Sequence, residues 1–307
     1  MEKYGAIDIG TNSTRLLIAA KEGEILRPLS MVIEVTRLGQ GVDKNRILQP
    51  ESMERTIKAL ENYKKLAQEA QVVNLQLVAT SAVRDAGNRQ EFLERVAHAT
   101  GLEVEIIPGE EEAKLTYWGA VADLDWPPGN IVVFDLGGGS TEFIVGDQQG
   151  TKLLTSIDVG AVRMTEAYLH SNPVTEEEYL AMKEHIRREL KEILTQIKEY
   201  QPRLLLGVGG TATSLAAMDQ ELTPYDPSKV HGYSVARQGI AGITKKLKGL
   251  PVEERATKLP GLHPKRADVI LGGTAVVETI LEMLNLDSLQ VSENDILLGT
   301  IYRLFRD

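Results

Sequence analysis

The fold is decided by the stretch Ile131-Val132-Val133-Phe134-Asp135-Leu136-Gly137-Gly138-Gly139-Ser140-Thr141-Glu142-Phe143-Ile144-Val145. Runs of β-branched and aromatic residues flank three glycines, a pattern that predicts strand, tight turn and strand. The glycines leave the turn without side chains, so its backbone N–H groups can approach an anion such as phosphate closely. Asp135 ends the first strand and is placed to hold Mg²⁺, because phosphate-bound Mg²⁺ usually takes only one or two protein carboxylates. The alternative is a glycine-rich hairpin that has an aspartate at its mouth and no ligand.

The N-terminus repeats this pattern in the stretch Asp8-Ile9-Gly10-Thr11-Asn12-Ser13-Thr14-Arg15-Leu16-Leu17-Ile18. Aligning the two aspartates also pairs Gly10 with Gly137, Ser13 with Ser140, Thr14 with Thr141 and Arg15 with Glu142. Two glycine turns in the same register indicate a duplicated domain that faces its copy across a cleft. Coincidental glycine turns are the alternative.

Composition limits the classes of protein that need to be considered. A chain of 307 residues, 42% hydrophobic and 25% charged, is typical of a globular protein and long enough for two domains. The absence of cysteine excludes disulfides and thiolate metal sites. A net charge of −10 argues against general nucleic-acid binding, because such binding needs a basic face that displaces counterions. No apolar stretch is long enough for a signal peptide or a span, so we expect a cytoplasmic protein that does not enter a membrane.

Three further segments carry candidate site residues. Arg84 follows a strand predicted from Leu75 to Ala79; at such a strand end it can grip phosphate, or it can form a surface ion pair with Asp85 or a neighbouring acid. Glu110-Glu111-Glu112 opens a helix, where acids complement the helix dipole, and one of the three can instead be a general base for water. The pattern does not choose among them. Gly207-Val208-Gly209-Gly210-Thr211 reads as a strand end, a turn and a helix start, which favours a third anion or nucleotide site or close helix packing.

The rest of the chain gives structural expectations. Thr175 and Glu178 form a capping box that opens a helix to Tyr200. The segment from Thr223 to Ser234 has no helical or strand period, which suits a substrate loop or an irregular surface crossing. Gly272 and Gly273 fall in the middle of a helix predicted from Lys265, where close approach of another backbone or a ligand would require them.

Taken together, these segments resemble the exopolyphosphatase and guanosine pentaphosphate phosphatase family, within the actin, hexokinase and heat-shock-ATPase superfold. The motifs that carry the resemblance are Asp8 to Ser13, Ala79 to Ala86, Gly109 to Lys114, Asp135 to Glu142, Gly207 to Thr211 and Leu259-Pro260-Gly261-Leu262. The resemblance implies an α/β fold of two duplicated actin-like (ribonuclease H-like) domains, with mixed five-stranded sheets and an interdomain cleft. We expect one domain from residues 1–122 with a C-terminal helix at about 294–307, and the other from 123–293.

By this resemblance the catalytic base is Glu112, and Glu142 is the second essential carboxylate. Asp8, Asp135 and Glu142 would hold or orient Mg²⁺, and Arg84 falls on the family's phosphate-binding arginine. The phosphate-binding residues would be Gly10, Thr11, Asn12, Ser13, Gly137, Gly138, Gly139, Ser140, Thr141, Gly209, Gly210 and Thr211. The implied reaction releases terminal phosphate from inorganic polyphosphate, guanosine pentaphosphate or both. A homodimer is expected from the family alone, and the sequence leaves open whether K⁺ is needed.

Two features depart from the family pattern. Many relatives continue into a helical C-terminal region that helps to hold long polyphosphate and to dimerise, whereas this chain stops at Asp307, which favours short polyphosphates or a nucleotide. In Ser292-Glu293-Asn294-Asp295-Ile296 relatives tend to have a glycine after the acid, and we expect a local change there without loss of chemistry.

Two other functions compete with hydrolysis. A small-molecule kinase of the same superfold would bind ATP at the Gly207 turn, but it would gain little from the second acid of the pair Glu112 and Glu142. A non-hydrolysing sensor would bind guanosine alarmones in the cleft and signal by domain closure.

Overall fold

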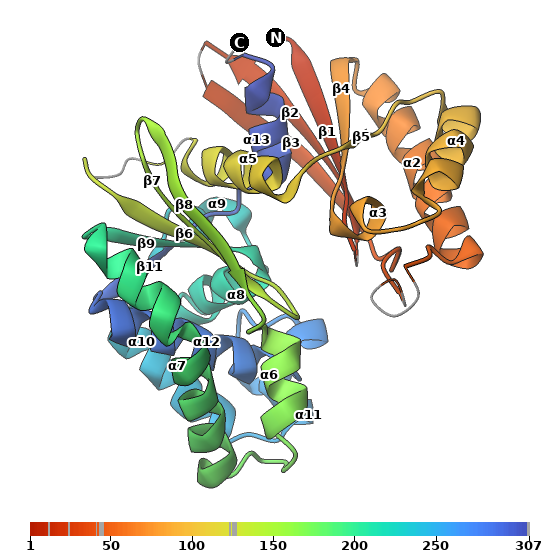
Figure 1. Cartoon of the computed structure of the whole chain (residues 1–307). Helices are drawn as coiled ribbons and strands as arrows, with labels where there is room; N and C mark the ends of the chain where they lie inside the picture. The colour runs from red at the N-terminus through yellow and green to blue at the C-terminus, as the bar shows by residue number, and fades with distance from the viewer. Residues whose placement is uncertain are drawn as a thin grey trace. The chain divides into compact units, whose positions relative to one another are not determined.

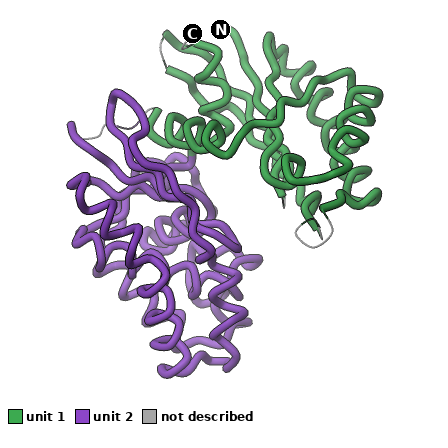
Figure 2. The backbone as a smooth tube through the Cα atoms, in the orientation of Figure 1, with its two compact units in different colours: residues 1–123, 294–307 green, residues 124–293 purple. Residues whose placement is uncertain are grey.

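The computed structural model describes residues 1–11, 13–23, 25–40, 42, 46–122, 124 and 128–305. The chain forms two compact units, shown in different colours in Figure 2. The first unit contains Met1–Asp123 and Asn294–Asp307, and the second contains Leu124–Glu293. Each unit has its own sheet and its own hydrophobic core.

The first unit is built on a five-stranded sheet with the order β3-β2-β1-β4-β5. Its strands are β1 (Lys3–Ile9), β2 (Thr14–Glu22), β3 (Ile25–Glu34), β4 (Val72–Ala79) and β5 (Glu105–Ile106). Its helices are α2 (Pro50–Glu69), α3 (Ser81–Arg84), α4 (Arg89–Thr100), α5 (Gly109–Val121) and α13 (Ile296–Arg303). β1, β2 and β3 pair antiparallel, whereas β4 runs parallel to β1 and to β5.

Both faces of this sheet are covered, which explains why its central strands are apolar at successive positions. Figure 1 shows α2 and α4 on one side of the sheet and α5 and α13 on the other. On β2, Leu16 belongs to the core that contains Tyr63 of α2, and its neighbour Leu17 belongs to the core that contains Ile301 of α13. Alternate residues of one strand therefore fill two different cores.

The second unit is built on a six-stranded sheet with the order β10-β11-β9-β6-β7-β8. Its strands are β6 (Ile131–Leu136), β7 (Thr141–Asp147), β8 (Gly150–Ile157), β9 (Leu204–Val208), β10 (Ser234–Ala236) and β11 (Ser288–Val291). Its helices are α6 (Ala161–Tyr168), α7 (Glu176–Glu199), α8 (Gly209–Asp219), α9 (Pro227–Val230), α10 (Arg237–Lys248), α11 (Val252–Lys258) and α12 (Ile270–Leu284), with a 3₁₀ turn η1 (Pro264–Arg266) before α12.

The two sheets repeat one topology. The order β8-β7-β6-β9-β11 of the second sheet matches β3-β2-β1-β4-β5 of the first, with the same antiparallel and parallel pairings. This is the strand order of the actin-like (ribonuclease H-like) domain, so the predicted fold class is confirmed. The second sheet has one strand more than predicted, because Ser234–Ala236 pairs antiparallel with β11. A strand of three residues is too short for its alternation to be seen in the sequence.

The glycine turns that suggested the duplication have the same geometry. The N–H of Gly10 donates to the carbonyl of Ser13 at 3.0 Å, and the N–H of Gly137 donates to the carbonyl of Ser140 at 3.0 Å. Beyond each turn, Asp8 lies opposite Arg15 and Asp135 lies opposite Glu142. The structure therefore confirms the register in which the two sequences were aligned.

Three local expectations can be compared with the structure. The capping box of Thr175 and Glu178 is present at the start of α7. The segment from Thr223 to Ser234 is not wholly irregular, because it contains the short helix α9. The expected position of Gly272 and Gly273 in mid-helix is wrong. The 3₁₀ turn η1 takes up the residues where the helix was expected to begin, and α12 begins only at Ile270, so both glycines lie in its first turn. Close approach is nevertheless their role, since a Cβ on Gly272 would lie 2.7 Å from the carbonyl oxygen of Ala161.

Helices α5 and α13 approach each other through two glycines. A Cβ on Gly299 would overlap the carbonyl oxygen of Leu115, and a Cβ on Gly119 would overlap that of Asp295. This contact fixes α5, which carries the three consecutive glutamates, against the C-terminal helix.

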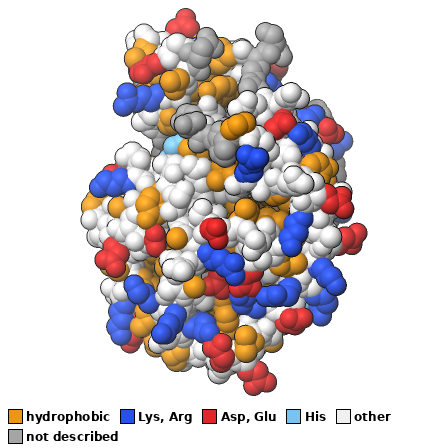
Figure 3. Space-filling view, turned by 90° about the vertical axis from the view of Figure 1, so that its left-hand side faces the viewer, with side chains coloured by type: hydrophobic (Ala, Val, Ile, Leu, Met, Phe, Trp, Pro, Cys, Tyr) orange, Lys and Arg blue, Asp and Glu red, His pale blue; other side chains and the backbone are white. Residues whose placement is uncertain are grey.

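Charged side chains of both signs are mixed over the face displayed in Figure 3. Ion pairs tie helices together, as where Lys183 and Arg187 of α7 both contact Glu282 of α12 at 2.8 Å. No helix in the described ranges is both long enough and apolar enough to cross a membrane.

The close packing of α5 on α13 gives a first testable prediction. Gly299→Ala should lower the free energy of unfolding by about 1–3 kcal/mol, the usual effect of overpacking, because the new methyl group has no space. Gly242→Ala on the exposed side of α10 is the matched control, because a Cβ there meets nothing within 4 Å. We expect the control to be neutral or to gain up to about 1 kcal/mol in a urea titration. Equal stability of the two variants would contradict the contact.

Candidate active site

The first glycine turn is tied to the loop that follows β4. The hydroxyl of Thr11 lies 2.9 Å from that of Ser81, the first residue of α3, and the carbonyl of Thr11 accepts a hydrogen bond from Gly39 N–H at 2.8 Å. Gly10 and Ser13 close the turn, while the predicted phosphate ligand Asn12 lies outside the described residues. The contact with Ser81 brings the turn beside α3, the short helix that ends at Arg84.

Asp8 is buried at the end of β1, with 5% of its surface exposed. Its Oδ2 accepts hydrogen bonds from Nε and Nη2 of Arg15 at 3.1 and 2.6 Å, and Nη1 of Arg15 donates to Oδ2 of Asp295. Its Oδ1 is buried and finds no hydrogen-bond partner among the residues that the structure describes. Burial raises the pKa of Asp8, Arg15 opposes that shift and Asp295 adds to it. An orphaned buried carboxylate oxygen beside a phosphate-type turn is a suitable ligand for a cation.

Sequence reasoning assigned no role to Arg15 or Asp295. The signal for Arg15 was present, because the alignment of the two hairpins places it directly across from Asp8. For Asp295 the sequence showed only a departure from the family pattern. The distance of Asp295 from Arg15 along the chain hides their contact.

Arg84 and Glu112, two of the predicted site residues, are in contact. Nη1 of Arg84 donates to Oε2 of Glu112 at 3.0 Å and to the carbonyl of Ile107 at 2.9 Å. Both side chains are about one-third exposed, at 29% and 32%. The guanidinium can therefore orient the carboxylate and still reach a phosphoryl oxygen. Asp85, the alternative partner for Arg84, is instead 3.7 Å from Arg46.

The structure distinguishes among the three glutamates at the start of α5. Glu110 pairs with Lys114 at 2.8 Å, and Glu111 lies 3.7 Å from Arg303 of α13. Only Glu112, of these three, contacts Arg84, the last residue of α3. Its neighbours have the ordinary role of helix-start acids, which the sequence pattern could not separate from a catalytic one.

In the second unit, the carboxylates of Asp135 and Glu142 occupy opposite positions on β6 and β7. Oε1 of Glu142 accepts hydrogen bonds from the hydroxyls of Ser140 at 2.8 Å and Ser156 at 2.7 Å. Like charges directly opposite in a ladder repel each other, so this pair favours a nearby cation. Ser156 was not predicted; it joins the site because β8 pairs it with Glu142.

The turn from Gly137 to Gly139 is held by its carbonyl groups. The carbonyls of Gly137 and Gly138 accept hydrogen bonds from Ala161 N–H at 3.0 Å and Val162 N–H at 2.9 Å, at the start of α6. Because the C=O and N–H of a trans peptide point in opposite directions, the N–H groups of Gly138 and Gly139 point away from α6. No backbone hydrogen bond to these two groups is found within the described ranges. They are suited to receive an anion.

The predicted hydroxyl of Thr141 has a structural use. Thr141 is fully buried, and its hydroxyl donates to the carbonyl of Val159 at 2.5 Å. A phosphate contact from Thr141 would therefore have to come from its backbone.

The third glycine turn lies beside Asp135. Gly209, with φ +80°, begins α8, and a Cβ there would lie 2.8 Å from Oδ1 of Asp135. The side chain of Arg266 covers Gly210, and Thr211 is buried. The first turn of α8, the carboxylate of Asp135 and the guanidinium of Arg266 thus form one cluster.

Tyr225 and Glu293 extend this cluster. The hydroxyl of Tyr225 donates to Oε1 of Glu293, and 45% of the surface of Tyr225 is exposed. Partial burial and the Glu293 carboxylate raise the pKa of Tyr225, which stays a neutral donor at physiological pH. The sequence predicted a substrate loop or a surface crossing for the segment that holds Tyr225. No residue spacing linked this segment to Arg266 or Glu293.

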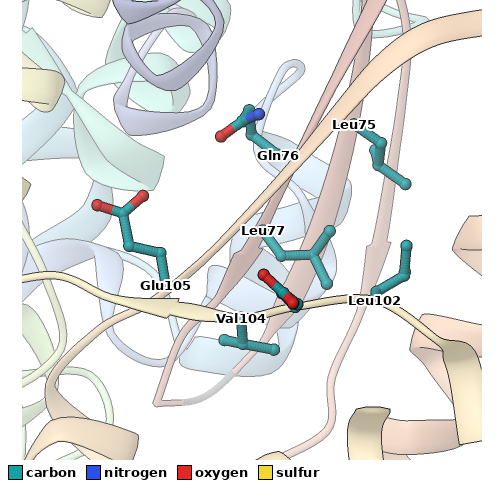
Figure 4. Close-up of a pocket in the computed structure, with 7 residues that line it drawn as sticks. Leu75, Gln76, Leu77, Leu102, Val104 and Glu105 are labelled. Atoms are coloured by element: carbon teal, nitrogen blue, oxygen red, sulfur yellow. The ribbon is translucent and has the colours of Figure 1, made fainter.

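A hollow at the edge of the first sheet is separate from these residues. Figure 4 shows it between β4 and the segment that leads to β5, lined by Leu75, Gln76, Leu77, Leu102, Glu103, Val104 and Glu105. It contains none of the predicted site residues, and Glu105 forms an ion pair with Arg303 at 2.5 Å. We do not assign it to catalysis.

Metal binding by these residues would have to rely on few protein ligands. No three His, Asp or Glu side chains of the described part of the chain are grouped so that they could hold a metal together. Mg²⁺ bound to phosphates needs only one or two carboxylates and otherwise keeps its waters. The unpartnered Oδ1 of Asp8 and the opposed pair of Asp135 and Glu142 fit that requirement.

The fold places this chain in the actin-like superfold, and its glycine turns, carboxylates and arginines form candidate phosphate sites. Known proteins resemble it closely. The model of the Ppx/GppA phosphatase family matches residues 17–306. Exopolyphosphatase 2 of Mycobacterium tuberculosis is 38% identical, with 97% of each chain covered. A structure of the Aquifex aeolicus Ppx/GppA phosphatase superposes with a TM-score of 0.89 at 35% identity, over 99% of each chain. This chain belongs to the Ppx/GppA phosphatase family.

The family domain also occurs inside a larger protein. The bifunctional 3-dehydroquinate synthase/phosphatase of Fusobacterium nucleatum is 35% identical over 96% of this chain, which spans 46% of that relative's length.

The contact of Arg84 with Glu112 gives a second prediction. Arg84→Met should lower kcat/KM for phosphate release by about 100-fold, a typical effect of removing one charge-stabilising donor, because it removes a candidate phosphate ligand and the guanidinium that contacts Glu112. Arg46→Met is the control: Arg46 pairs with Asp85 at 3.7 Å and does not touch Glu112. Similar kcat/KM values for the two variants would show that Arg84 neither binds the substrate phosphate nor orients Glu112.

Proposed function

We propose that this chain hydrolyses the terminal phosphoanhydride bond of inorganic polyphosphate in a reaction that depends on Mg²⁺. The observation that carries the proposal is the contact of Arg84 with Glu112 at 3.0 Å. It couples a guanidinium that can grip a phosphoryl oxygen to a carboxylate that can take a proton from water. The named activity of the mycobacterial relative supports polyphosphate as the substrate.

The proposed mechanism gives each group one task. Glu112 takes the proton of a water molecule whose oxygen bonds to the terminal phosphorus. The bridging P–O bond breaks, the shortened polyphosphate leaves, and Arg84 holds an oxygen of the transferring group. The N–H groups of Gly138 and Gly139 hold phosphate oxygens, and the hydroxyls of Ser140 and Ser156 fix Glu142. When bound, Mg²⁺ would neutralise charge on the phosphates. The candidate carboxylates that would hold or orient it are Asp8 in the first unit and the opposed pair of Asp135 and Glu142 in the second.

A kinase of the same superfold is less well supported. It would also use carboxylates around Mg²⁺, so Glu142 does not separate the two functions. The Ppx/GppA phosphatase family and the exopolyphosphatase named among the relatives favour water as the acceptor.

The proposed base can be tested directly. Glu112→Gln should lower phosphate release from tripolyphosphate by about 10²–10⁴-fold, the usual contribution of a general base, while substrate binding measured by calorimetry persists. Glu110→Gln is the control on the same helix turn, since Glu110 pairs with Lys114 and does not contact Arg84. Turnover near the wild-type rate in Glu112→Gln would remove Glu112 from this role.

Guanosine pentaphosphate is a second candidate substrate, favoured by the exposed ring of Tyr225. Its hydroxyl is anchored on Glu293, and Arg266 lies beside the first turn of α8. An aromatic face next to an anion-binding helix start can stack a nucleobase while the backbone holds phosphates.

This second candidate predicts a change in selectivity. Tyr225→Ala should lower kcat/KM for guanosine pentaphosphate by about tenfold, because stacking on an aromatic ring is worth roughly 1–3 kcal/mol. The rate on tripolyphosphate should not change. Tyr225→Phe, which keeps the ring, should retain both activities. Equal losses on both substrates in Tyr225→Ala would show that the ring does not recognise the base.

A further inference from the structure

Arg15 contacts Asp8 in an unusual way. An arginine and a carboxylate commonly pair through two parallel bonds, one to each carboxylate oxygen. Here Nε and Nη2 of Arg15 both donate to Oδ2 of Asp8, at 3.1 and 2.6 Å. Oδ1 of Asp8 is buried and takes no hydrogen bond from the described residues. The guanidinium therefore binds one oxygen and makes no hydrogen bond to the other.

The remaining arm of Arg15 is held by Asp295. Nη1 of Arg15 donates to Oδ2 of Asp295, and the two side chains are 22% and 15% exposed. Asp295 itself has little freedom. Its Oδ1 caps α13 by accepting Leu297 N–H at 3.0 Å, and its carbonyl packs against Gly119 of α5. The fixed carboxylate of Asp295 thus sets the orientation in which the Arg15 guanidinium binds Asp8.

We propose that Asp295 is a positioning residue that keeps Oδ1 of Asp8 available to a divalent cation by holding Nη1 of Arg15. Without that anchor, the guanidinium is free to rotate and pair with both oxygens of Asp8, which covers Oδ1. This inference rests on the Mg²⁺ site of the proposed function and adds a residue that acts on it through Arg15.

A simple charge effect makes a different prediction. Asp295 also contributes a negative charge, and losing that charge would weaken cation binding with or without Arg15. In the positioning account the loss requires the arginine, so removing Arg15 as well should restore binding. The two explanations therefore separate in a double-mutant cycle.

The experiment measures Mn²⁺ binding to the full-length protein by electron paramagnetic resonance, with Mn²⁺ alone as the probe. Asp295→Asn keeps the shape and a good helix cap but removes the charged anchor. We expect it to weaken Mn²⁺ binding by about 10- to 100-fold, as is typical when a residue that orients a metal ligand is lost. Arg15→Met combined with Asp295→Asn should bind Mn²⁺ nearly as tightly as Arg15→Met alone.

Two controls make the result specific. Asp8→Asn should abolish Mn²⁺ binding, which places the ion at Asp8. Arg303→Gln loosens the other end of α13, where Arg303 pairs with Glu105 at 2.5 Å, and should leave Mn²⁺ binding unchanged. Thermal melts establish that each variant is folded.

The possible outcomes are distinct. If the double variant is as weak as Asp295→Asn, Asp295 acts by charge alone and the inference is wrong. The inference is also wrong if Asp295→Asn binds Mn²⁺ like the wild type while Asp8→Asn does not bind it. That result would still support a metal site at Asp8. If Asp8→Asn binds Mn²⁺ normally, both the Asp8 metal site and this inference fall, whereas polyphosphate hydrolysis is judged separately by phosphate release.

Discussion

Each unit depends on a β-hairpin whose turn is closed by a backbone hydrogen bond. The closed turn fixes the strand register, and the register sets which residue of the second strand lies opposite the acid at the end of the first. Glycine N–H to serine carbonyl bonds of 3.0 Å close both turns. The ladder then fixes Asp8 against Arg15 in one unit and Asp135 against Glu142 in the other. The same backbone constraint thus produces an acid that an arginine holds through one oxygen in one copy, and an acid pair that favours a cation in the other.

The surrounding elements hold these hairpins from outside. Backbone N–H groups at the start of α6 donate hydrogen bonds to the carbonyls of Gly137 and Gly138, and the first residue of α3 contacts Thr11. The glycine contact between α5 and α13 fixes the helix of Glu112 against the helix that begins beside Asp295. Close packing therefore fixes the backbone of the elements that carry the carboxylates of the proposed chemistry. Arginine and serine side chains then hold the carboxylate groups themselves. This arrangement suits a reaction in which positioning and charge stabilisation contribute most.

The sequence revealed those features whose cause is local or periodic. The repeated hairpin could be predicted because few structures other than a hairpin fit a glycine turn between two apolar runs. The pairing register of its two strands followed from the alignment of Asp8 with Asp135. The capping box of α7 is likewise a local signal. Contacts between distant segments could not be predicted: nothing near Arg15 points to Asp295, and nothing near Gly210 points to Arg266. The η1 turn moved the start of α12 to Ile270 because a single 3₁₀ turn has no period that a sequence pattern can show.

In the proposed reaction, a water molecule activated by Glu112 attacks the terminal phosphorus of a phosphoanhydride. The most direct measurement is hydrolysis of tripolyphosphate by the purified protein with Mg²⁺ in ¹⁸O-labelled water, followed by mass spectrometry of the products. We expect each turnover to release one phosphate that carries a single ¹⁸O atom and to leave unlabelled pyrophosphate. Release of phosphate without label, or no release by the folded protein in the presence of Mg²⁺, would contradict the proposed reaction.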